Sequence, residues 1–337
     1  MRSPSPNTTS VAIPVRAGRP AAVSSAILAG VRLLQIALTL LVSSFVTFAL
    51  LRLAPGDPIT IILGSESNNQ LAVAELRKRF LLDQPLLVQY WHWLSSALRG
   101  DLGESYLFHD SVSSLVAERL PTTLFLVAYG GLLVILVGFL LGLWAARSNR
   151  AVDVGVSSLL AVALATPSYV VAIVLITIFS LFLSWFPVLG SGDGFLDRLH
   201  HLTLPAITLA LSASAAMARI TRASIIDEAD RDHVLTARAR GFAPREILWR
   251  HIIRNALLPV TTIAGITVAS LVAGTVIVEK AFGLDGVGSL LVLAITRGDF
   301  PTIQSITFLI VLSFLVVNAV VDLLYALLDP RTRAVAR

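Results

Sequence analysis

Six long apolar stretches, separated by polar segments, constrain the fold of this chain more than any other feature of its sequence. Each stretch is long enough to cross a hydrocarbon core of about 30 Å as a helix. A helix satisfies its own backbone polar groups within one segment, and the short alternating runs of a membrane-spanning strand are absent from the sequence. We therefore predict an all-α integral membrane protein with six transmembrane helices, at about residues 26–53, 120–146, 154–183, 200–222, 255–279 and 302–327.

The composition agrees with a membrane protein and excludes other classes. Hydrophobic residues make up 55% of the 337 positions, charged residues make up 14%, and the mean hydropathy is +0.81. An ordinary soluble domain carries about 25% charged residues. The net charge of +5 could indicate binding to nucleic acid, but the basic residues lie between the apolar stretches instead of along one stripe, so no nucleic-acid partner is expected. Cysteine is absent, which excludes disulfides and thiolate chemistry.

The distribution of basic residues predicts the orientation. With the N-terminus in the cytoplasm, seventeen of the 26 basic residues fall in cytoplasmic segments, as the positive-inside rule requires. Both termini are then cytoplasmic, in tails at 1–25 and 329–337, and the first tail is expected to be disordered because it lacks apolar periodicity. The first apolar stretch is too long for a signal-peptide core and lacks a convincing cleavage site, so it should remain as a span.

The outer segment at 54–119 is expected to be partly helical. Asp83-Gln84-Pro85 is typical of a helix start, and apolar residues recur at helical spacing after it. A second short amphipathic stretch, at 112–120, is expected to end at Pro121. These helices could form a lid or a docking surface for a partner, or they could lie at the bilayer interface, anchored by Trp91 and Trp93.

The segment between the fourth and fifth spans, at 223–254, has the pattern of a helical hairpin. Its acidic residues precede Arg238 and Arg240, the order that a helix macrodipole favours; the acidic residues are Asp227, Glu228, Asp230 and Asp232. Gly241 is a natural helix stop, and Pro244 suits the first turn of a new helix. We predict a short helix, a sharp turn and a second helix that leads back into the membrane.

The short helix is a candidate contact for another protein. Small residues near Gly241 would let a partner approach the backbone, and bulkier neighbours could fill a hydrophobic groove. The alternative is a solvated basic loop that only orients the chain. The candidate contact residues are Asp232, Val234, Leu235, Thr236, Ala237, Arg238, Ala239, Arg240, Gly241 and Phe242.

At this segment the sequence resembles a known family. Thr236-Ala-Arg-Ala-Arg-Gly241, followed by His251-Ile-Ile-Arg-Asn-Ala-Leu-Leu-Pro259, is similar to the cytoplasmic loop of type I ABC importer permeases, and more closely to the oligopeptide/dipeptide/nickel branch. Leu235 and Thr236 replace the Glu-Ala that begins the loop in the wider group, and the closing proline falls later, as is usual in the peptide branch. Further motifs resemble the same branch in its order and indicate the first of its two permease subunits; they are Arg52-Leu-Ala-Pro-Gly-Asp-Pro58, Arg99-Gly-Asp-Leu-Gly103, Glu279-Lys-Ala-Phe282 and Arg297-Gly-Asp-Phe-Pro301.

This resemblance implies a type I ABC importer transmembrane fold in a bacterial cytoplasmic membrane. The partners that it implies are a homologous second permease in a heterodimer, two cytoplasmic ATPase subunits that bind ATP and magnesium, an extracytoplasmic solute-binding lipoprotein, and membrane lipid. The short helix ending at Gly241 would be the coupling helix that sits in a groove of the ATPase. The chain itself would be a transport subunit without catalytic residues or a bound cofactor.

Other candidate sites are weaker. Neither lysine lies in a phosphate-binding loop, so ATP must bind elsewhere. Gly190-Ser191-Gly192 could suggest a nucleophilic serine, but no nearby base has the required spacing. His200 and His201 could bind a metal, yet adjacent residues on a helix do not face one another, and no metal site is predicted.

Two acidic residues and two prolines within the predicted spans are further candidates for a functional or structural role. Glu279 and Asp322 are acids near span ends, where ionisable groups are functional by default; they could instead reach the interface or pair locally, Asp322 with Asn318. Pro167 is expected to kink the third span and to help shape a pathway. Pro205, near the start of the fourth span, is better tolerated.

The preferred hypothesis is a permease subunit for di- or oligopeptides. The same machine could instead carry nickel, another chelated metal or a small polar solute. An ATP-independent channel or an intramembrane enzyme is the remote alternative, and it would need no ATPase partner.

Overall fold

The computed structural model describes residues 21–53, 59, 70–79 and 83–328. The tail predicted at 329–337 and the first 20 residues of the tail predicted at 1–25 lie outside these ranges, as do parts of the predicted outer segment, at 54–58, 60–69 and 80–82. The remaining residues of the N-terminal tail belong to the first helix, which begins at Ala21, five residues before the predicted start of the first span.

Helices make up almost all of the described chain. They are, in order, α1 (Ala21–Leu53), α3 (Gln70–Arg79), α4 (Leu86–Ala97), α5 (Val112–Arg147), α6 (Arg150–Ala165), α7 (Ser168–Leu175), the π-helix η2 (Ile176–Phe182), α8 (Gly194–Ala229), α9 (Asp232–Ala239), α10 (Pro244–Glu246), the π-helix η3 (Ile247–Ile253), α11 (Arg254–Ala281), α12 (Val287–Arg297) and α13 (Phe300–Leu328). The prediction of an all-α protein is confirmed.

Five helical segments are long and apolar enough to cross a membrane, namely Gly30–Leu53, Val112–Arg147, Gly194–Ala229, Pro244–Ala281 and Phe300–Val321. The predicted third span is different, because α6 and the α7–η2 segment are bent by 103° at the break between them. Pro167 lies at this break, and its ring prevents the preceding residue from continuing a helix. Counted as one broken span, this pair completes the predicted six.

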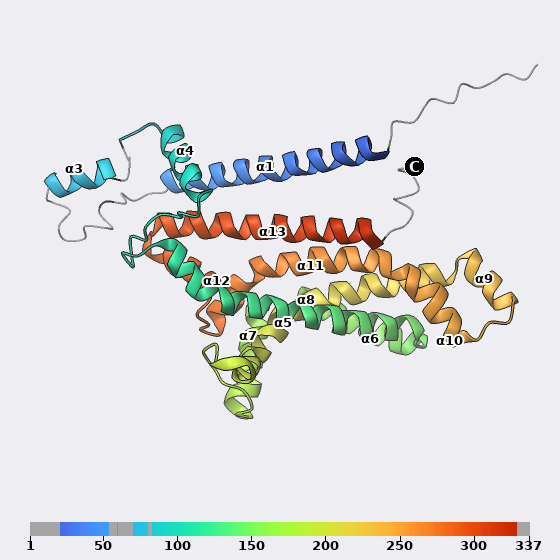
Figure 1. Cartoon of the computed structure of the whole chain (residues 1–337). Coiled ribbons are helices and arrows are strands. Elements are labelled where there is room, and N and C mark those ends of the chain that lie inside the picture. The colour runs from blue at the N-terminus through green and yellow to red at the C-terminus, as the bar shows by residue number, and fades with distance from the viewer. Residues whose placement is uncertain (1–20, 54–58, 60–69, 80–82, 329–337) are drawn as a thin grey trace, which may run out of the picture.

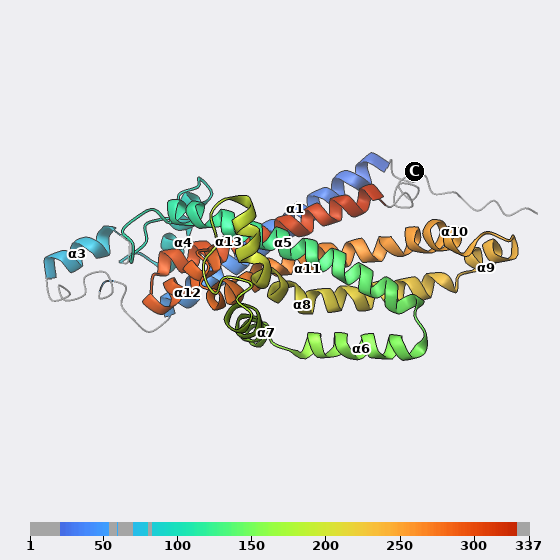
Figure 2. The ribbon, with the colours of Figure 1, turned by 90° about the horizontal axis from the view of Figure 1, so that it is seen from below.

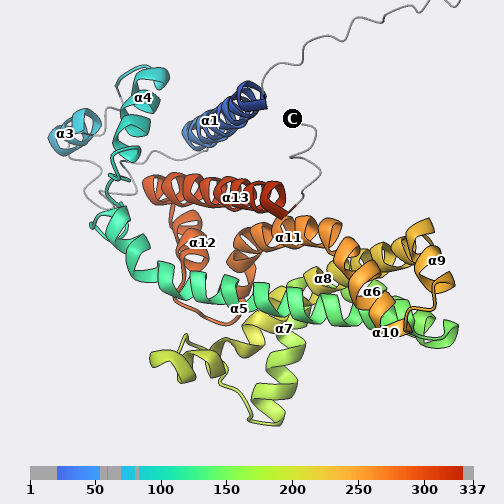
Figure 3. The same ribbon diagram turned by 45° about the vertical axis from the view of Figure 1, so that its right-hand side comes forward.

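The long helices run side by side (Figures 1 and 3). The start of α1, the end of α13 and the α9 segment lie at one end of the molecule, and α3, α4 and α12 lie at the other (Figure 1). We call these the cytoplasmic and outer ends, following the distribution of arginine. The start of α1, α9 and the end of α13 thus share one end, as the predicted topology requires.

Glycines let α5 and α8 approach closely. A Cβ on Gly138 would lie 2.6 Å from the Met217 side chain, and one on Gly142 would lie 2.6 Å from the Thr221 side chain and the Ala218 carbonyl oxygen. Small residues four apart are a common means of close helix packing in membranes. Next to this contact, Val156 and Leu160 of α6 pack against Ala215 and Ala218 of α8 before the chain turns into α7 (Figure 2).

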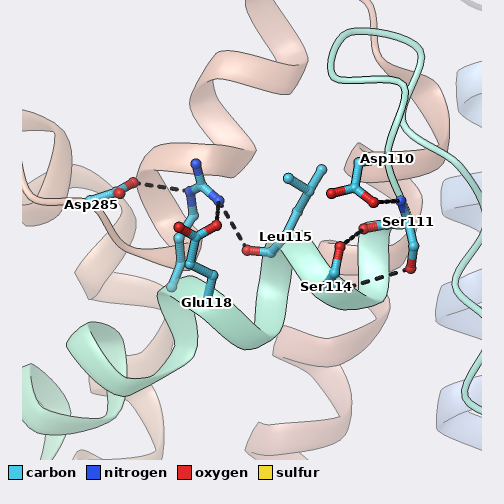
Figure 4. Close-up of polar contacts among 7 residues, drawn as sticks. Asp110, Ser111, Ser114, Leu115, Glu118 and Asp285 are labelled. Carbon is cyan, nitrogen blue, oxygen red and sulfur yellow. Dashed lines mark hydrogen bonds and ion pairs between the residues drawn. The ribbon is translucent and has the colours of Figure 1, made fainter.

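The predicted short amphipathic stretch at 112–120 is instead the first part of α5, and the helix continues through Pro121. Ser111 caps this start by accepting a hydrogen bond from the Ser114 backbone N–H. Arg119 forms an ion pair with Asp285 at 3.0 Å and also donates a hydrogen bond to the Leu115 carbonyl oxygen; Figure 4 labels both partners. Because Val112, Leu115 and Val116 pack against α12 and α13, the outer part of α5 belongs to the helical core.

Candidate functional site

The predicted coupling helix is α9, an eight-residue helix at the cytoplasmic end between α8 and α10 (Figures 1 and 3). It ends where the sequence indicated. Gly241 has a φ of +80°, and its N–H bonds the Arg238 carbonyl oxygen, while the Phe242 N–H bonds the Ala237 carbonyl oxygen. This pair of bonds is a Schellman motif, which glycine favours because it needs a left-handed residue after the helix. Pro244 then opens α10, as predicted.

A polar cluster joins α9 to both neighbouring membrane helices. Glu228, at the end of α8, accepts a hydrogen bond from the Asn255 amide of α11 at 2.9 Å. The same carboxylate lies 3.3 Å from Nε2 of His233 in α9. Asn255 Nδ2 also bonds the His251 carbonyl oxygen at 3.1 Å. These contacts restrict movement of α9 relative to α8 and α11.

An apolar cluster beneath α9 corrects one prediction. Val234 is 0% exposed and Ala237 is also buried, and both pack against Ile225, Ile247 and Ile252 of this chain. The prediction that Ala237 and Val234 contact another protein is therefore corrected, because neither side chain reaches the surface; Val234 packs inward. Its role is to hold α9 on the ends of α8 and η3.

The remaining candidates face solvent. Leu235 is 51% exposed and Phe242 is 37% exposed. Gly241 has open space beside its Cα, since nothing lies within 4 Å of the position that a Cβ would occupy. The other exposed members of the predicted set are Asp232, Thr236, Arg238, Ala239 and Arg240. The result is a small surface of two apolar side chains and bare backbone, bordered by two arginines.

The acidic residues lie differently from the prediction. Asp227 and Glu228 belong to the end of α8, which continues to Ala229 beyond the predicted span, and Asp230 follows it. Only Asp232 lies in the first turn of α9. The macrodipole argument therefore holds for one acid of the four, and Glu228 has the pairing role described above.

The structure also corrects the interpretation of Glu279 as an acid that reaches the membrane interface or pairs with a residue nearby in the sequence. Its side chain is 0% exposed, and Oε1 accepts a hydrogen bond from Thr123 Oγ1 of α5 at 2.7 Å. Oε2 accepts one from the backbone N–H of Ser289 at the start of α12, at 3.0 Å. A Cβ on Gly286 would collide with this carboxylate. Glu279 thus joins α5, α11 and α12, and α12 itself is a helix that the sequence did not predict.

The other acid, Asp322, has its backbone in α13, but its side chain lies outside the described residues. Its suggested partner Asn318 donates a hydrogen bond to the Phe314 carbonyl oxygen at 2.8 Å.

Asp299 fixes the outer loop to the start of α13, and no local sequence signal indicates this role. It is buried, and its carboxylate accepts hydrogen bonds from the Tyr106 backbone N–H at 3.0 Å and from Thr302 Oγ1 at 2.7 Å. Burial raises the pKa of the Tyr106 phenol to about 12; the nearby charge of Asp299 adds to this and that of Arg52 opposes it. The Tyr106 phenol therefore stays neutral at physiological pH.

His200 and His201 do lie near a third possible metal ligand, although the sequence predicted no metal site here. One ligand atom each from Asp197, His200 and His201 lies within 4.8 Å of the others. His200 Nε2 is 2.8 Å from the Trp185 carbonyl oxygen, and His201 Nδ1 is 3.3 Å from Asp197 Oδ1. The cluster is largely exposed at the outer end of α8.

A depression with hydroxyl groups lies beside the break in the third span. It has a volume of about 470 Å³ and lies between α7, α8 and α11. Four hydroxyl-bearing residues line it among small and apolar ones: Ser168, Ser212, Thr267 and Ser270. Ser168 directly follows Pro167, so the break helps to shape this depression. Pro205, by contrast, is buried inside α8, which continues through it.

Comparison with known proteins identifies the family. Residues 138–334 match the family described as binding-protein-dependent transport system inner membrane component, and residues 28–127 match the N-terminal model of the same membrane component. The chain belongs to this family. It is 37% identical over 303 residues to the glutathione transport system permease protein GsiC of Salmonella choleraesuis, which covers 90% of this chain and 97% of the relative. A provisionally named peptide transport system permease protein of Brucella abortus is 37% identical over 306 residues, with the same coverage.

Solved structures support the fold. A crystal structure of an amino acid ABC transporter matches with a TM-score of 0.53 at 20% identity, covering 63% of this chain and 94% of that one. The inward-facing MetNI methionine ABC transporter matches with a TM-score of 0.54 at 17% identity, covering 64% of this chain and 96% of that one. These two structures support the fold alone. Membership of the family makes the chain a multi-pass inner-membrane permease of an ABC importer, a transport subunit and not an enzyme, and implies an ATPase and a binding protein as partners.

Proposed function

We propose that this permease pairs with a homologous second permease and forms with it the pathway for di- or oligopeptides. Two ATPase subunits would drive the pair, and an extracytoplasmic lipoprotein would deliver the peptide. The named cargoes of the two relatives, glutathione and peptides, support a peptide cargo. The observation that carries the ATPase coupling in this proposal is α9, whose position is fixed by Glu228 and Val234 while Leu235 and Phe242 remain exposed.

A fixed α9 suits coupling for a thermodynamic reason. Moving a two-state equilibrium from 1:99 to 99:1 needs about 5.5 kcal/mol of differential binding. A flexible loop would lose part of that free energy to its own rearrangement. Because α9 is held both by an apolar cluster and by a polar one, displacement of its exposed surface is transmitted to α8 and α11.

Single cysteines test this contact cleanly, because the chain contains no cysteine of its own. In the assembled transporter, Leu235→Cys and Phe242→Cys are expected to crosslink to the ATPase subunit through a short reagent with one thiol-reactive end, which bonds the cysteine, and one photoreactive end, which inserts into any nearby C–H bond of the ATPase. Val234→Cys, next to Leu235 but buried, is the matched control and should give no adduct. The measurement is a mobility shift that contains both subunits.

Two outcomes would contradict the assignment. One is the absence of an ATPase adduct from both exposed positions. The other is labelling of Leu235→Cys in intact cells by a thiol reagent that cannot cross the inner membrane, since this would place α9 on the outer side.

The hydroxyl-lined depression is the candidate part of the pathway on this chain. Its volume lies within the range of about 300–1,000 Å³ that is common for small-molecule sites, and its hydroxyl groups can replace hydrogen bonds between a peptide and water. Ser270 is exposed within it. We expect Ser270→Trp to block most dipeptide uptake by filling the space, while Ser270→Ala leaves uptake close to that of the wild type.

The measurement is uptake of a labelled dipeptide by the reconstituted transporter, normalised to the amount of permease in the membrane. Near-normal uptake by Ser270→Trp would mean that the cargo passes elsewhere.

A chelated metal is the second candidate cargo, because Asp197, His200 and His201 gather possible ligand atoms at the outer end of α8. Parallel uptake assays with a dipeptide and with chelated nickel separate the two cargoes. Nickel uptake without dipeptide uptake would favour the second.

A further inference from the structure

A cavity of about 210 Å³ at the outer end has a chemistry that peptide transport does not explain. It lies between the end of α1, α4, the loop after α4 and the start of α13. Its apolar wall includes Phe48, Leu51 and Phe300. Its polar wall includes the side chains of Arg52, Trp93 and Gln304.

Two of these side chains are donors without an acceptor in the described part of the chain. Gln304 is only 7% exposed, and its buried Nε2 has no hydrogen-bond partner there. The buried Nε1 of Trp93 also has none. The guanidinium of the half-buried Arg52 lies over the Phe48 ring, 5.3 Å from its centroid, and no ion pair joins it to a carboxylate among the described residues.

Such an arrangement selects a ligand rich in acceptor oxygens. A buried donor without a partner costs about 1–3 kcal/mol, which a bound acceptor removes. The planar guanidinium of arginine pairs well with carboxylate or phosphate. Tryptophan N–H and amide N–H groups add two further donors to the same anion.

The position of the cavity favours a lipid phosphate. Arg52 is the next-to-last residue of the first candidate span, and Gln304 lies one turn into the last helix. A helix of this length that crosses the hydrocarbon core places residues at its end near the lipid headgroups. Helix α4 lies across the outer end of α1 (Figures 1 and 3). It exposes Leu87 and Trp91 at helical spacing, and Leu98 directly after its end, as an interfacial helix does.

We propose that this cavity binds the phosphate of a phospholipid headgroup from the outer leaflet. Arg52, Trp93 and Gln304 would donate to the phosphate oxygens. Asp101, which is exposed, and Glu104 also line the cavity, and their negative charge disfavours a purely anionic headgroup. They match a headgroup that carries an amine, so phosphatidylethanolamine should bind in preference to phosphatidylglycerol.

The test counts lipids retained by the intact transporter. The complex is reconstituted in vesicles of phosphatidylethanolamine and phosphatidylglycerol, extracted in detergent and analysed by native mass spectrometry. Arg52→Gln and Gln304→Leu should each lower retention of phosphatidylethanolamine by about tenfold, since each removes one strong hydrogen bond. Arg99→Gln, which removes an exposed cation at the same end but outside the cavity, should leave retention unchanged.

Each other outcome would overturn the proposal. Unchanged retention in either folded variant would show that the donors do not bind lipid, and Gln304→Leu carries the test if Arg52→Gln does not fold. Competition by a dipeptide or by inorganic phosphate would show a solute site. Equal retention of phosphatidylglycerol would remove the role assigned to the two carboxylates.

Discussion

Replacing Gly241 with glutamate is expected to abolish uptake while the permease stays in the membrane at nearly normal level. Gly241 has a φ of +80°, which costs a residue with a side chain roughly 1–2 kcal/mol. The position is open, with nothing within 4 Å of an added Cβ, so the new side chain has room in this chain. It would project instead into the surface where the ATPase is proposed to bind, and would place a desolvated negative charge there.

The matched control is Gly241→Asn. Asparagine tolerates the left-handed region better than other residues with side chains, and it carries no charge. This variant should retain much of the uptake. Immunoblotting of membranes separates loss of protein from loss of function. Wild-type uptake by Gly241→Glu, with the permease present at normal amount, would count against α9 as the coupling helix.

Local signals in the sequence predicted a large part of the fold. Apolar stretches of about 20 residues identify spans because the bilayer imposes their length. The end of α9 and the start of α10 were also predictable, since Gly241 and Pro244 each impose a backbone conformation that suits one helix terminus. The start of α4 after Pro85 followed from the same kind of signal.

Features that depend on distant partners were not predictable. The continuation of α8 to Ala229 has no sequence signal, because the acids that end it are equally compatible with the start of the next helix. Val234 looked like a contact residue, since its neighbours in the sequence do not reveal that Ile247 and Ile252 cover it. Pro167 predicts a kink, but the 103° bend depends on how α6 and α7 pack.

The contacts of Glu279 also depend on a residue that is distant in the sequence, so they could not be predicted. Removing Glu279 is expected to have the largest effect on the stability of the permease. Its partner Thr123 is 156 residues away in the sequence. Glu279→Leu would leave the Thr123 hydroxyl and the Ser289 N–H buried without an acceptor, at about 1–3 kcal/mol each. We expect a much lower yield of folded permease and an apparent unfolding temperature in detergent that is lower by several degrees. Glu279→Gln should be intermediate, because it keeps one acceptor oxygen and the shape of the side chain.

A double-mutant cycle with Gly286 tests whether this contact is the cause. Gly286 has a φ of −121°, which any residue adopts, so Gly286→Ala should destabilise only because its Cβ collides with the Glu279 carboxylate. In a Glu279→Ala background that collision is absent, and Gly286→Ala should cost little. The two single effects must then sum to more than the effect of the double variant. Additive effects would mean that Gly286 and Glu279 stabilise the α11–α12 junction independently.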